Sequence, residues 1–238
     1  MSGIKVAYSA EGVEFVGALF LPSGSGKAPG VLVAHESPGI TGHTLDAAER
    51  LAGLGFVALA TDYQGGGQVV TDREEMMRRF AWFMEDPSHI RARMGAALEA
   101  LTAQPRVNAW RLAAVGYCYG GTAALELARG GADLKAVVGF HCGLDTARPQ
   151  DAAAIKGKVL VQIGAEDPVV PATQRAAFEQ EMIAAGVDWR MVLHGKTGHS
   201  FTNPEADSWG MPGFAYQADS DRRSWAAMRD HFAEAGLL

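Results

Sequence analysis

The sequence predicts an α/β fold: a mainly parallel sheet with helices on both faces and an antiparallel hairpin at its N-terminal edge. Apolar runs of strand length alternate with helical stretches along the chain, which is the pattern of parallel strands joined by crossover helices. Residues 30–36, Gly-Val-Leu-Val-Ala-His-Glu, are apolar over most of their length, as expected of a strand buried on both faces. Residues 4–8 and 13–21 flank a Glu-Gly turn, which predicts the hairpin.

Each strand is predicted from a short apolar run that ends at polar or glycine residues. In chain order, the expected strands cover residues 4–8, 13–21, 30–36, 56–61, 112–115, 134–140, 158–163 and 189–193. Polar side chains follow several of these runs directly. Because the carboxyl ends of parallel strands meet at one edge of a sheet, we expect the functional site at that edge.

The helices are predicted from apolar positions at helical spacing and from residues that start or stop a helix. Gly55 and Gly186 end two of them, and Pro87 starts a third. In chain order, the expected helices cover residues 44–54, 72–84, 88–103, 122–128, 173–185 and 222–235. Residues 62–70 contain three consecutive glycines without a following Gly-Lys-Ser/Thr, so they are predicted as a loop rather than a phosphate-binding turn.

Length and composition exclude several classes of protein. The chain has 238 residues, of which 48% are hydrophobic and 20% charged, and we expect a single domain over residues 1–238. The net charge of −6 and the lack of basic runs argue against nucleic-acid binding. No apolar stretch has the length of a membrane span and the start lacks a signal-peptide pattern, so a soluble cytoplasmic protein is expected. The two cysteines, Cys118 and Cys142, are expected to be free thiols.

Cys118 is the strongest candidate for a reactive side chain. It lies in Gly-Tyr-Cys-Tyr-Gly-Gly at residues 116–121, between an apolar strand and a helix-forming stretch. This is the strand-turn-helix pattern of a nucleophile elbow, with cysteine where the motif usually has serine. The N-terminus of the following helix favours the thiolate form. A buried structural thiol is the commoner role of a free cysteine, but it does not explain the flanking glycines.

Acidic residues and a histidine follow other predicted strands. Glu36, Asp62 and Asp167 lie at strand ends, and His199 lies in the loop after the last strand. Cys118, Asp167 and His199 follow the chain order nucleophile, acid, histidine that α/β folds use for covalent hydrolysis. Each intervening stretch has room for a helix and a strand, so we expect the three side chains to meet at one edge.

Four segments carry a more specific signal when they are taken together. They are His35-Glu36, residues 116–121, residues 164–171 (Gly-Ala-Glu-Asp-Pro-Val-Val-Pro) and residues 198–201 (Gly-His-Ser-Phe). In type and order, these segments resemble the dienelactone hydrolase family of cysteine α/β hydrolases, and they span most of the chain. The resemblance implies an α/β-hydrolase fold and a hydrolase that needs no cofactor.

The resemblance also implies a role for individual side chains. Cys118 is expected to be the nucleophile, His199 the base and then the acid, and Asp167 the group that orients the imidazole. Glu36 is expected to contact the resting thiol and to take part in forming the thiolate when substrate binds. The family thus predicts a triad assisted by a second carboxylate.

Backbone groups and a pocket complete the expected site. The N–H groups of Tyr119 and Ser37 are expected to form an oxyanion hole. His141 follows a strand, where it could line the pocket or cap the strand, and both interpretations stay open. The segment 203–217 is long for a plain connection and is rich in aromatics that could wall the pocket. The tentative pocket residues are His141, Asn203, Trp209 and Phe214.

Rival residues have simpler interpretations. Three rival side chains are predicted to be structural or solvated: His194, Asp145 and Glu166. His35, Glu36 and His43 do not have the His-Glu-x-x-His spacing of a metal site, and no metal is expected.

One departure from the family concerns the substrate. Members that act on dienelactone hold its carboxylate with arginines, one of them four residues after the catalytic histidine, where this chain has Asn203. The candidates for a second arginine are Arg73, Arg78 and Arg79.

The expected function is hydrolysis of small activated esters or lactones through an acyl-cysteine intermediate. Three enzymatic alternatives stay open: a dienelactone hydrolase proper, a thioesterase, and a promiscuous esterase or phosphotriesterase. A non-catalytic ligand receptor with the same fold is the alternative from another class. The expected partner is a small-molecule ester or lactone, without nucleic acid or membrane, and the oligomeric state stays open.

Overall fold

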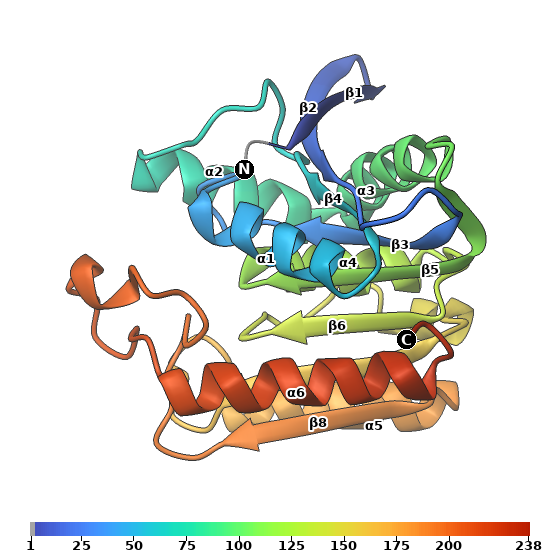
Figure 1. The fold of residues 1–238 in the computed structure, drawn as a ribbon. Coiled ribbons are helices and arrows are strands. Elements are labelled where there is room, and N and C mark those ends of the chain that lie inside the picture. The colour runs from blue at the N-terminus through green and yellow to red at the C-terminus, as the bar shows by residue number, and fades with distance from the viewer. Residues whose placement is uncertain (1–2) are drawn as a thin grey trace.

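A computed structural model describes residues 3–238. Its strands are β1 (Ile4–Ala10), β2 (Val13–Phe20), β3 (Ala28–Ala34), β4 (Val57–Thr61), β5 (Val107–Tyr117), β6 (Ala136–Phe140), β7 (Lys158–Gly164) and β8 (Trp189–His194). They form one eight-stranded sheet in the order β1-β2-β4-β3-β5-β6-β7-β8 (Figure 1). β2 pairs antiparallel with β1 and β4, whereas all other neighbours are parallel. The predicted sheet and its N-terminal hairpin are confirmed.

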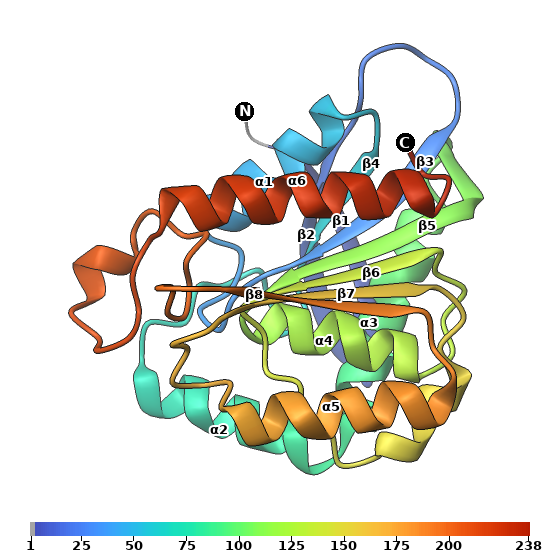
Figure 2. The same cartoon turned by 90° about the horizontal axis from the view of Figure 1, so that it is seen from below.

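Helices cover both faces of the sheet (Figure 2). They are α1 (Gly42–Gly53), α2 (Arg73–Glu85), α3 (Pro87–Thr102), α4 (Tyr119–Arg129), α5 (Ala172–Ala185) and α6 (Ala218–Glu234), with the short 3-10 helices η1 (Pro149–Ala154) and η2 (Ala206–Trp209). α1 and α6 lie on one face and α3, α4 and α5 on the other, with α2 packed against α3. None of the helices within residues 3–238 is long and apolar enough to cross a membrane.

The core consists of two apolar clusters, one on each face of the sheet. Within β3, Leu32 belongs to one cluster and Val31 and Val33 to the other, because successive side chains of a strand point to opposite faces. All three side chains are fully buried, and each such burial stabilises the fold by about 1.5–3 kcal/mol. The continuous apolar run in the sequence thus contributes to both cores at once.

β5 begins earlier than the sequence predicts. It starts at Val107, ahead of the predicted residue 112. Its pairing with β3 shifts register at a bulge, because Pro29 pairs with Asn108 but Gly30 pairs with Leu112. The bulged residues include exposed side chains, so this part of the strand has no apolar pattern to mark it.

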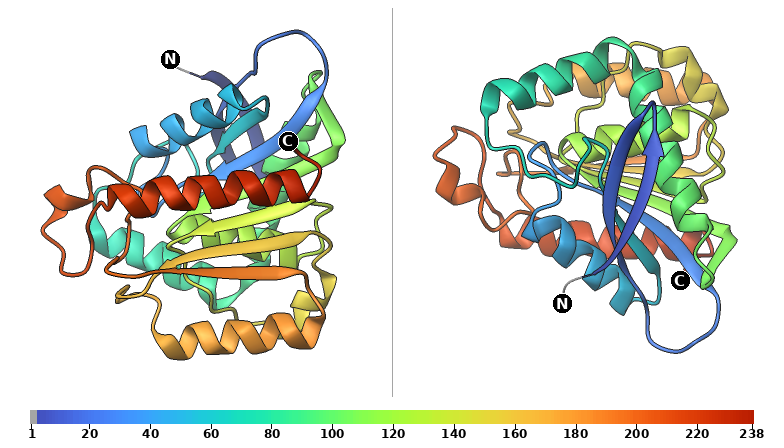
Figure 3. Two further views of the ribbon diagram at one scale, coloured as in Figure 1. Left: turned by 60° about the horizontal axis from the view of Figure 1, so that its bottom comes forward. Right: turned by 90° about the horizontal axis from the view of Figure 1, so that it is seen from above.

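The fold brings the strand ends predicted to carry function to one edge. The parallel strands point to the left in Figure 1, where the segment between β8 and α6 projects from the molecule. The sheet is strongly twisted, so the N-terminal hairpin crosses the direction of the central strands (Figure 3). The hairpin packs against α3, and β2 bonds to Asp62 and the loop that follows β4.

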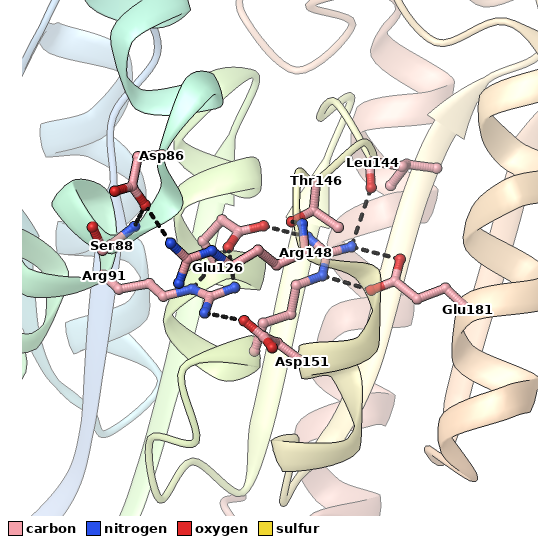
Figure 4. Close-up of polar contacts among 10 residues, drawn as sticks. Asp86, Ser88, Arg91, Glu126, Leu144, Thr146, Arg148, Asp151 and Glu181 are labelled. Carbon is pink, nitrogen blue, oxygen red and sulfur yellow. Dashed lines mark hydrogen bonds and ion pairs between the residues drawn. The ribbon is translucent and has the colours of Figure 1, made fainter.

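Buried ion pairs fasten α4, the helix that follows Cys118, to its neighbours. The fully buried Arg129 donates to Glu181 Oε1 at 2.7 Å and to Glu126 Oε1 at 2.9 Å. Arg91, on α3, donates to the other oxygen of Glu126 at 2.8 Å and to Asp151 Oδ2 at 2.5 Å (Figure 4). The network thereby joins α3, α4, η1 and α5, and removing one member would leave a buried charge without its partner.

Candidate active site

Cys118 occupies the turn between β5 and α4, as the sequence predicts. Its backbone has φ 51° and ψ −122°, a region that costs a non-glycine residue about 1–3 kcal/mol. The turn is possible because two neighbours have no side chain. A Cβ on Gly116 would lie 2.0 Å from the carbonyl oxygen of Gly120, and one on Gly120 would lie 2.2 Å from that of Ala34. The close packing of β5, α4 and β3 holds the half-buried thiol at the sheet edge.

His199 and Asp167 lie beside the thiol. His199 Nε2 is 3.2 Å from Cys118 Sγ, and its Nδ1 is 2.8 Å from Asp167 Oδ2. The other oxygen of Asp167 accepts the backbone N–H groups of Val169 at 2.8 Å and Val170 at 3.3 Å. These bonds hold the carboxylate so that it faces the imidazole. The three side chains that the sequence singles out are thus in contact.

The charges around His199 favour its imidazolium form. Burial opposes this form, but the neighbouring Cys118 thiolate and the Asp167 carboxylate outweigh burial and raise the pKa of His199 to about 10. At neutral pH, the imidazolium therefore faces the sulfur across 3.2 Å. The arrangement places a positive charge and an N–H donor directly beside the sulfur.

The segment after β8 folds back on His199. The His199 N–H donates to the carbonyl of Gly213 at 2.8 Å, and the His199 carbonyl accepts from Ala215 N at 3.2 Å. The ring of Phe214 packs edge-to-face on the imidazole with centroids 4.8 Å apart. Residues 203–217, which the sequence marks as too long for a plain connection, thus fix the position of this histidine.

The Glu36 carboxylate has other partners than the thiol. Asn203 Nδ2 donates to its Oε2 at 2.6 Å, Ser200 Oγ donates to its Oε1 at 3.5 Å, and His43 Nδ1 lies 3.2 Å from Oε2. The expected contact with Cys118 is not found among the hydrogen bonds of residues 3–238. The amide of Asn203 is the short donor to the carboxylate, while His199 is the partner of the sulfur.

The backbone groups predicted for the oxyanion hole belong to Tyr119, which follows Cys118 in the chain, and to Ser37, whose hydroxyl approaches the sulfur. Tyr119 begins α4, so its N–H has no acceptor within the helix. Ser37 follows β3, its carbonyl accepts from Gln64 Nε2 at 2.6 Å, and its hydroxyl lies 3.9 Å from Cys118 Sγ. The role of both N–H groups stays a prediction, although their positions suit it.

The rival candidates lie apart from the thiol. His194 ends β8 and packs on Phe201 with ring centroids 5.2 Å apart. Asp145 is exposed and accepts from Gln174 at 2.5 Å, and Glu166 is exposed. None of the three has a hydrogen bond to Cys118 or His199 within the described part of the chain.

The tentative pocket residues fall into two groups. His141 and Asn203 are buried and bond to the Cys118 amide and to Glu36, respectively, and Phe214 packs on His199. Trp209 is 37% exposed at the end of η2, and its pocket role stays a prediction.

The arginines proposed for a substrate carboxylate lie on α2. Arg78 and Arg79 both pair with Glu75, which draws their charge toward their own helix. Arg73 is exposed at the start of α2.

Two side chains of the site, Thr202 and His43, are not predicted from the sequence. Thr202 bonds to both His141 and His43, yet a single threonine carries no signal in the sequence beyond its nearness to His199. His43 is considered in the sequence only as a metal ligand, whereas in the structure it approaches Glu36.

The mixed sheet, together with the strand-turn-helix at Cys118, defines an α/β-hydrolase fold. The sequence profile of the dienelactone hydrolase family matches residues 15–236. The chain therefore belongs to the dienelactone hydrolase family, and the predicted resemblance is confirmed.

Similar proteins agree with this assignment. A solved structure named m3DLH is 45% identical with a TM-score of 0.95, covering 98% of this chain and 97% of that one. A dienelactone hydrolase-like promiscuous phosphotriesterase from metagenomic libraries is 42% identical with a TM-score of 0.92 over the same shares. A putative carboxymethylenebutenolidase of Methylorubrum extorquens is 26% identical over 228 residues, which are 91% of this chain and 76% of that protein.

Proposed function

We propose that this protein hydrolyses small esters or lactones through an acyl-cysteine intermediate, without a cofactor. The observation that carries the proposal is that His199 contacts Cys118 Sγ at 3.2 Å through Nε2 and Asp167 at 2.8 Å through Nδ1. A non-catalytic ligand receptor would not need an imidazole held between a carboxylate and a strained thiol.

In the first half of the reaction, the Cys118 thiolate attacks the carbonyl carbon. A sulfur–carbon bond forms, and the carbonyl π electrons move to the oxygen, which the N–H groups of Tyr119 and Ser37 stabilise. When the carbonyl re-forms, the bond to the leaving alkoxide breaks, and the alkoxide takes the proton from His199 Nε2. An acyl-cysteine and a neutral imidazole remain.

In the second half, water replaces the alcohol. His199 Nε2 takes a proton from the water as its oxygen bonds to the acyl carbon, and Asp167 stabilises the imidazolium that forms. The tetrahedral intermediate then expels the thiolate and releases the acid. The ion pair of Cys118 and His199 is restored, so no external reactant other than water is required.

The polar groups near the thiol favour neutral substrates in this proposal. Position 203 holds asparagine, whose neutral amide bonds to the 4% exposed Glu36. This side chain carries no positive charge that could receive a substrate carboxylate. An anionic lactone would instead meet the charge of Glu36. We therefore favour neutral activated esters, with dienelactone hydrolysis as the second candidate.

A phosphotriesterase side activity belongs to the same proposal. It is supported by the 42% identical relative that is described as a promiscuous phosphotriesterase. Attack on a phosphoryl centre also places negative charge on an oxygen, so the same N–H groups could stabilise it. The resulting sulfur–phosphorus bond is expected to be labile to water because a thiolate is a good leaving group.

Stopped-flow mixing with p-nitrophenyl butyrate tests the proposal. We expect a burst of p-nitrophenol with an amplitude near one per active site, and a covalent butyryl adduct on Cys118 in quenched samples by mass spectrometry. A receptor would bind the ester without a burst. Turnover without an adduct on Cys118 would contradict the mechanism.

A further inference from the structure

A row of three side chains, the buried His141 and Thr202 and the partly buried His43, leads from Glu36 to the backbone of the nucleophile. The Cys118 backbone N–H, which also donates to the Phe140 carbonyl at 2.9 Å, donates to His141 Nδ1 at 3.2 Å. His141 Nε2 lies 2.8 Å from Thr202 Oγ1, and that oxygen lies 3.2 Å from His43 Nε2. His43 Nδ1 then lies 3.2 Å from Glu36 Oε2. We call this row the His141–Thr202–His43 bridge.

The proton positions in this bridge follow from its first member. A backbone amide can only donate, so His141 Nδ1 is the acceptor and its proton is on Nε2. His141 Nε2–H therefore donates to Thr202, whose single proton must go on to His43 Nε2. That leaves the proton of His43 on Nδ1, facing the Glu36 carboxylate. With His43 neutral, this arrangement fits the hydrogen bonds of the bridge, and the approach of His43 Nδ1 to Glu36 Oε2 at 3.2 Å is an electrostatic contact rather than an aligned hydrogen bond.

The environment of His141 supports this arrangement. Burial, with the positive charge of His199 as a smaller cause, lowers the pKa of His141 well below its ordinary value, so its ring is neutral. The ring packs against His199 and Phe201 with centroids 5.2 Å from each. Its backbone N–H donates to the Gln162 carbonyl at 2.8 Å. The acceptor nitrogen is therefore held firmly under the elbow.

The strained backbone of Cys118 needs neighbours that hold it in place. Within residues 3–238, five non-glycine residues have a positive φ, and three of them are Cys118, His141 and Ser200, which lie at this site. A residue held in this region persists only when its surroundings fix it. The amide of Cys118 is the group that the bridge holds, and its orientation decides where Sγ points.

We propose that His141, Thr202 and His43 are positioning residues that couple the Glu36 carboxylate to the backbone of Cys118 and so hold the sulfur against His199. This inference rests on the proposed function, because it concerns the same thiol. Glu36 then acts on the nucleophile through the bridge. When the carboxylate changes its partner, the orientation of the Cys118 backbone changes with it, although Glu36 does not contact the sulfur.

Thr202→Val is the main test, with Thr202→Ser as its matched control. Valine keeps the shape and removes the hydroxyl, whereas serine keeps the hydroxyl and loses a methyl group. With p-nitrophenyl butyrate, we expect Thr202→Val to lower kcat about tenfold with KM changed less than about twofold, and Thr202→Ser to stay within about twofold of wild type. Equal losses in both variants, or no loss in valine, would overturn the proposal.

His43→Phe breaks the bridge at another contact. It keeps the proposal testable if Thr202→Val does not fold. The ring of His43 packs edge-to-face on Tyr117 with centroids 4.6 Å apart, and phenylalanine preserves this packing. We expect His43→Phe to match Thr202→Val, and the double variant to be no worse than either single one. Additive losses would show that the residues act separately and would overturn the coupling.

Alkylation of Cys118 by iodoacetamide separates this inference from the proposed function. The reaction needs an oriented thiolate but no ester chemistry, so it reports on the bridge even if the protein proves not to be an esterase. We expect alkylation to slow in Thr202→Val and His43→Phe and not in Thr202→Ser. An unchanged alkylation rate in both broken variants would contradict the bridge, whereas wild-type alkylation without ester turnover would contradict only the function.

Discussion

At the scale of single residues, the contact between Cys118 and His199 is the feature on which the proposed chemistry depends. The thiol is half-buried at a strained turn, and the imidazole beside it is buried between two negative groups. Either side chain alone would be an ordinary buried residue. Together they bring a sulfur and an imidazole N–H donor into contact at 3.2 Å, which is the arrangement that the proposed mechanism requires.

Removal of the thiol is the first prediction. We expect Cys118→Ala to lower ester turnover by several orders of magnitude, because the covalent route is lost, while the melting temperature stays close to that of wild type. His199→Ala is expected to be nearly as damaging, and His194→Ala, which changes a residue without contact to the thiol, is the control. More than about a tenth of wild-type activity in Cys118→Ala would contradict the mechanism.

The second prediction concerns the titration of His199. Because the thiolate is a main cause of its raised pKa, the imidazolium should persist in the wild type until the pH approaches about 10. In Cys118→Ser this negative charge is absent, so the pKa should fall, since burial then opposes only the effect of Asp167. NMR titration of labelled histidine measures both values. An identical titration in the two proteins would show that the sulfur carries no charge beside His199.

Asn203 is the subject of the third prediction. A charge-assisted hydrogen bond to a substrate carboxylate contributes about 1.5–3 kcal/mol, so Asn203→Arg should raise kcat/KM for a carboxylated lactone about ten- to a hundredfold relative to p-nitrophenyl butyrate. Asn203→Gln lengthens the side chain without a charge and serves as the control. A wild type that already favours the anionic lactone tenfold would refute the proposed preference for neutral esters.

At the scale of elements, α4 connects the chemistry to the rest of the fold. Its first turn presents the N–H of Tyr119 near the sulfur, and its last turn carries Glu126 and Arg129. The close approach of Gly120 to β3 sets one end of the helix, and the ion pairs set the other. Both ends must be fixed because the helix has to support a strained turn.

The fourth prediction tests the ion pairs of α4. Arg129→Met leaves the buried carboxylates of Glu126 and Glu181 without this partner, so the free energy of unfolding should fall by about 3–5 kcal/mol. Arg222→Met is the control, because Arg222 pairs with Asp219 at the exposed surface and its loss should leave the urea midpoint close to that of wild type. Urea denaturation measures both changes. Similar losses in the two variants would contradict a special role for the buried network.

At the scale of the whole molecule, one sheet supplies both apolar clusters. Strands from its two halves contribute side chains to each cluster, and no cluster belongs to one half of the chain. The fifth prediction is therefore that the chain unfolds as one unit, as expected of a single domain. Tryptophan fluorescence and far-UV circular dichroism should follow the same urea transition. Two separate transitions would contradict the single domain.

The sequence by itself determined the fold class, the elbow around Cys118 and the order of Cys118, Asp167 and His199. These features depend on local patterns: apolar runs of strand length, glycines that permit a tight turn, and polar residues at the ends of strands. Local patterns survive in a single sequence because neighbouring residues in the chain produce them. The bulge in β5 has no such pattern, so the sequence predicts a start at residue 112 for a strand that begins at Val107.

Only the tertiary structure decided which groups Glu36, His43 and Thr202 contact. Thr202 and His43 lie far apart in the chain, and so do Glu36 and Asn203, so no local spacing predicts their hydrogen bonds. The family resemblance predicts a contact of Glu36 with the thiol, and in the fold Asn203 Nδ2 donates to the Glu36 carboxylate. The competition between donors depends on the positions of several strand ends at once, and the packing of the sheet sets those positions.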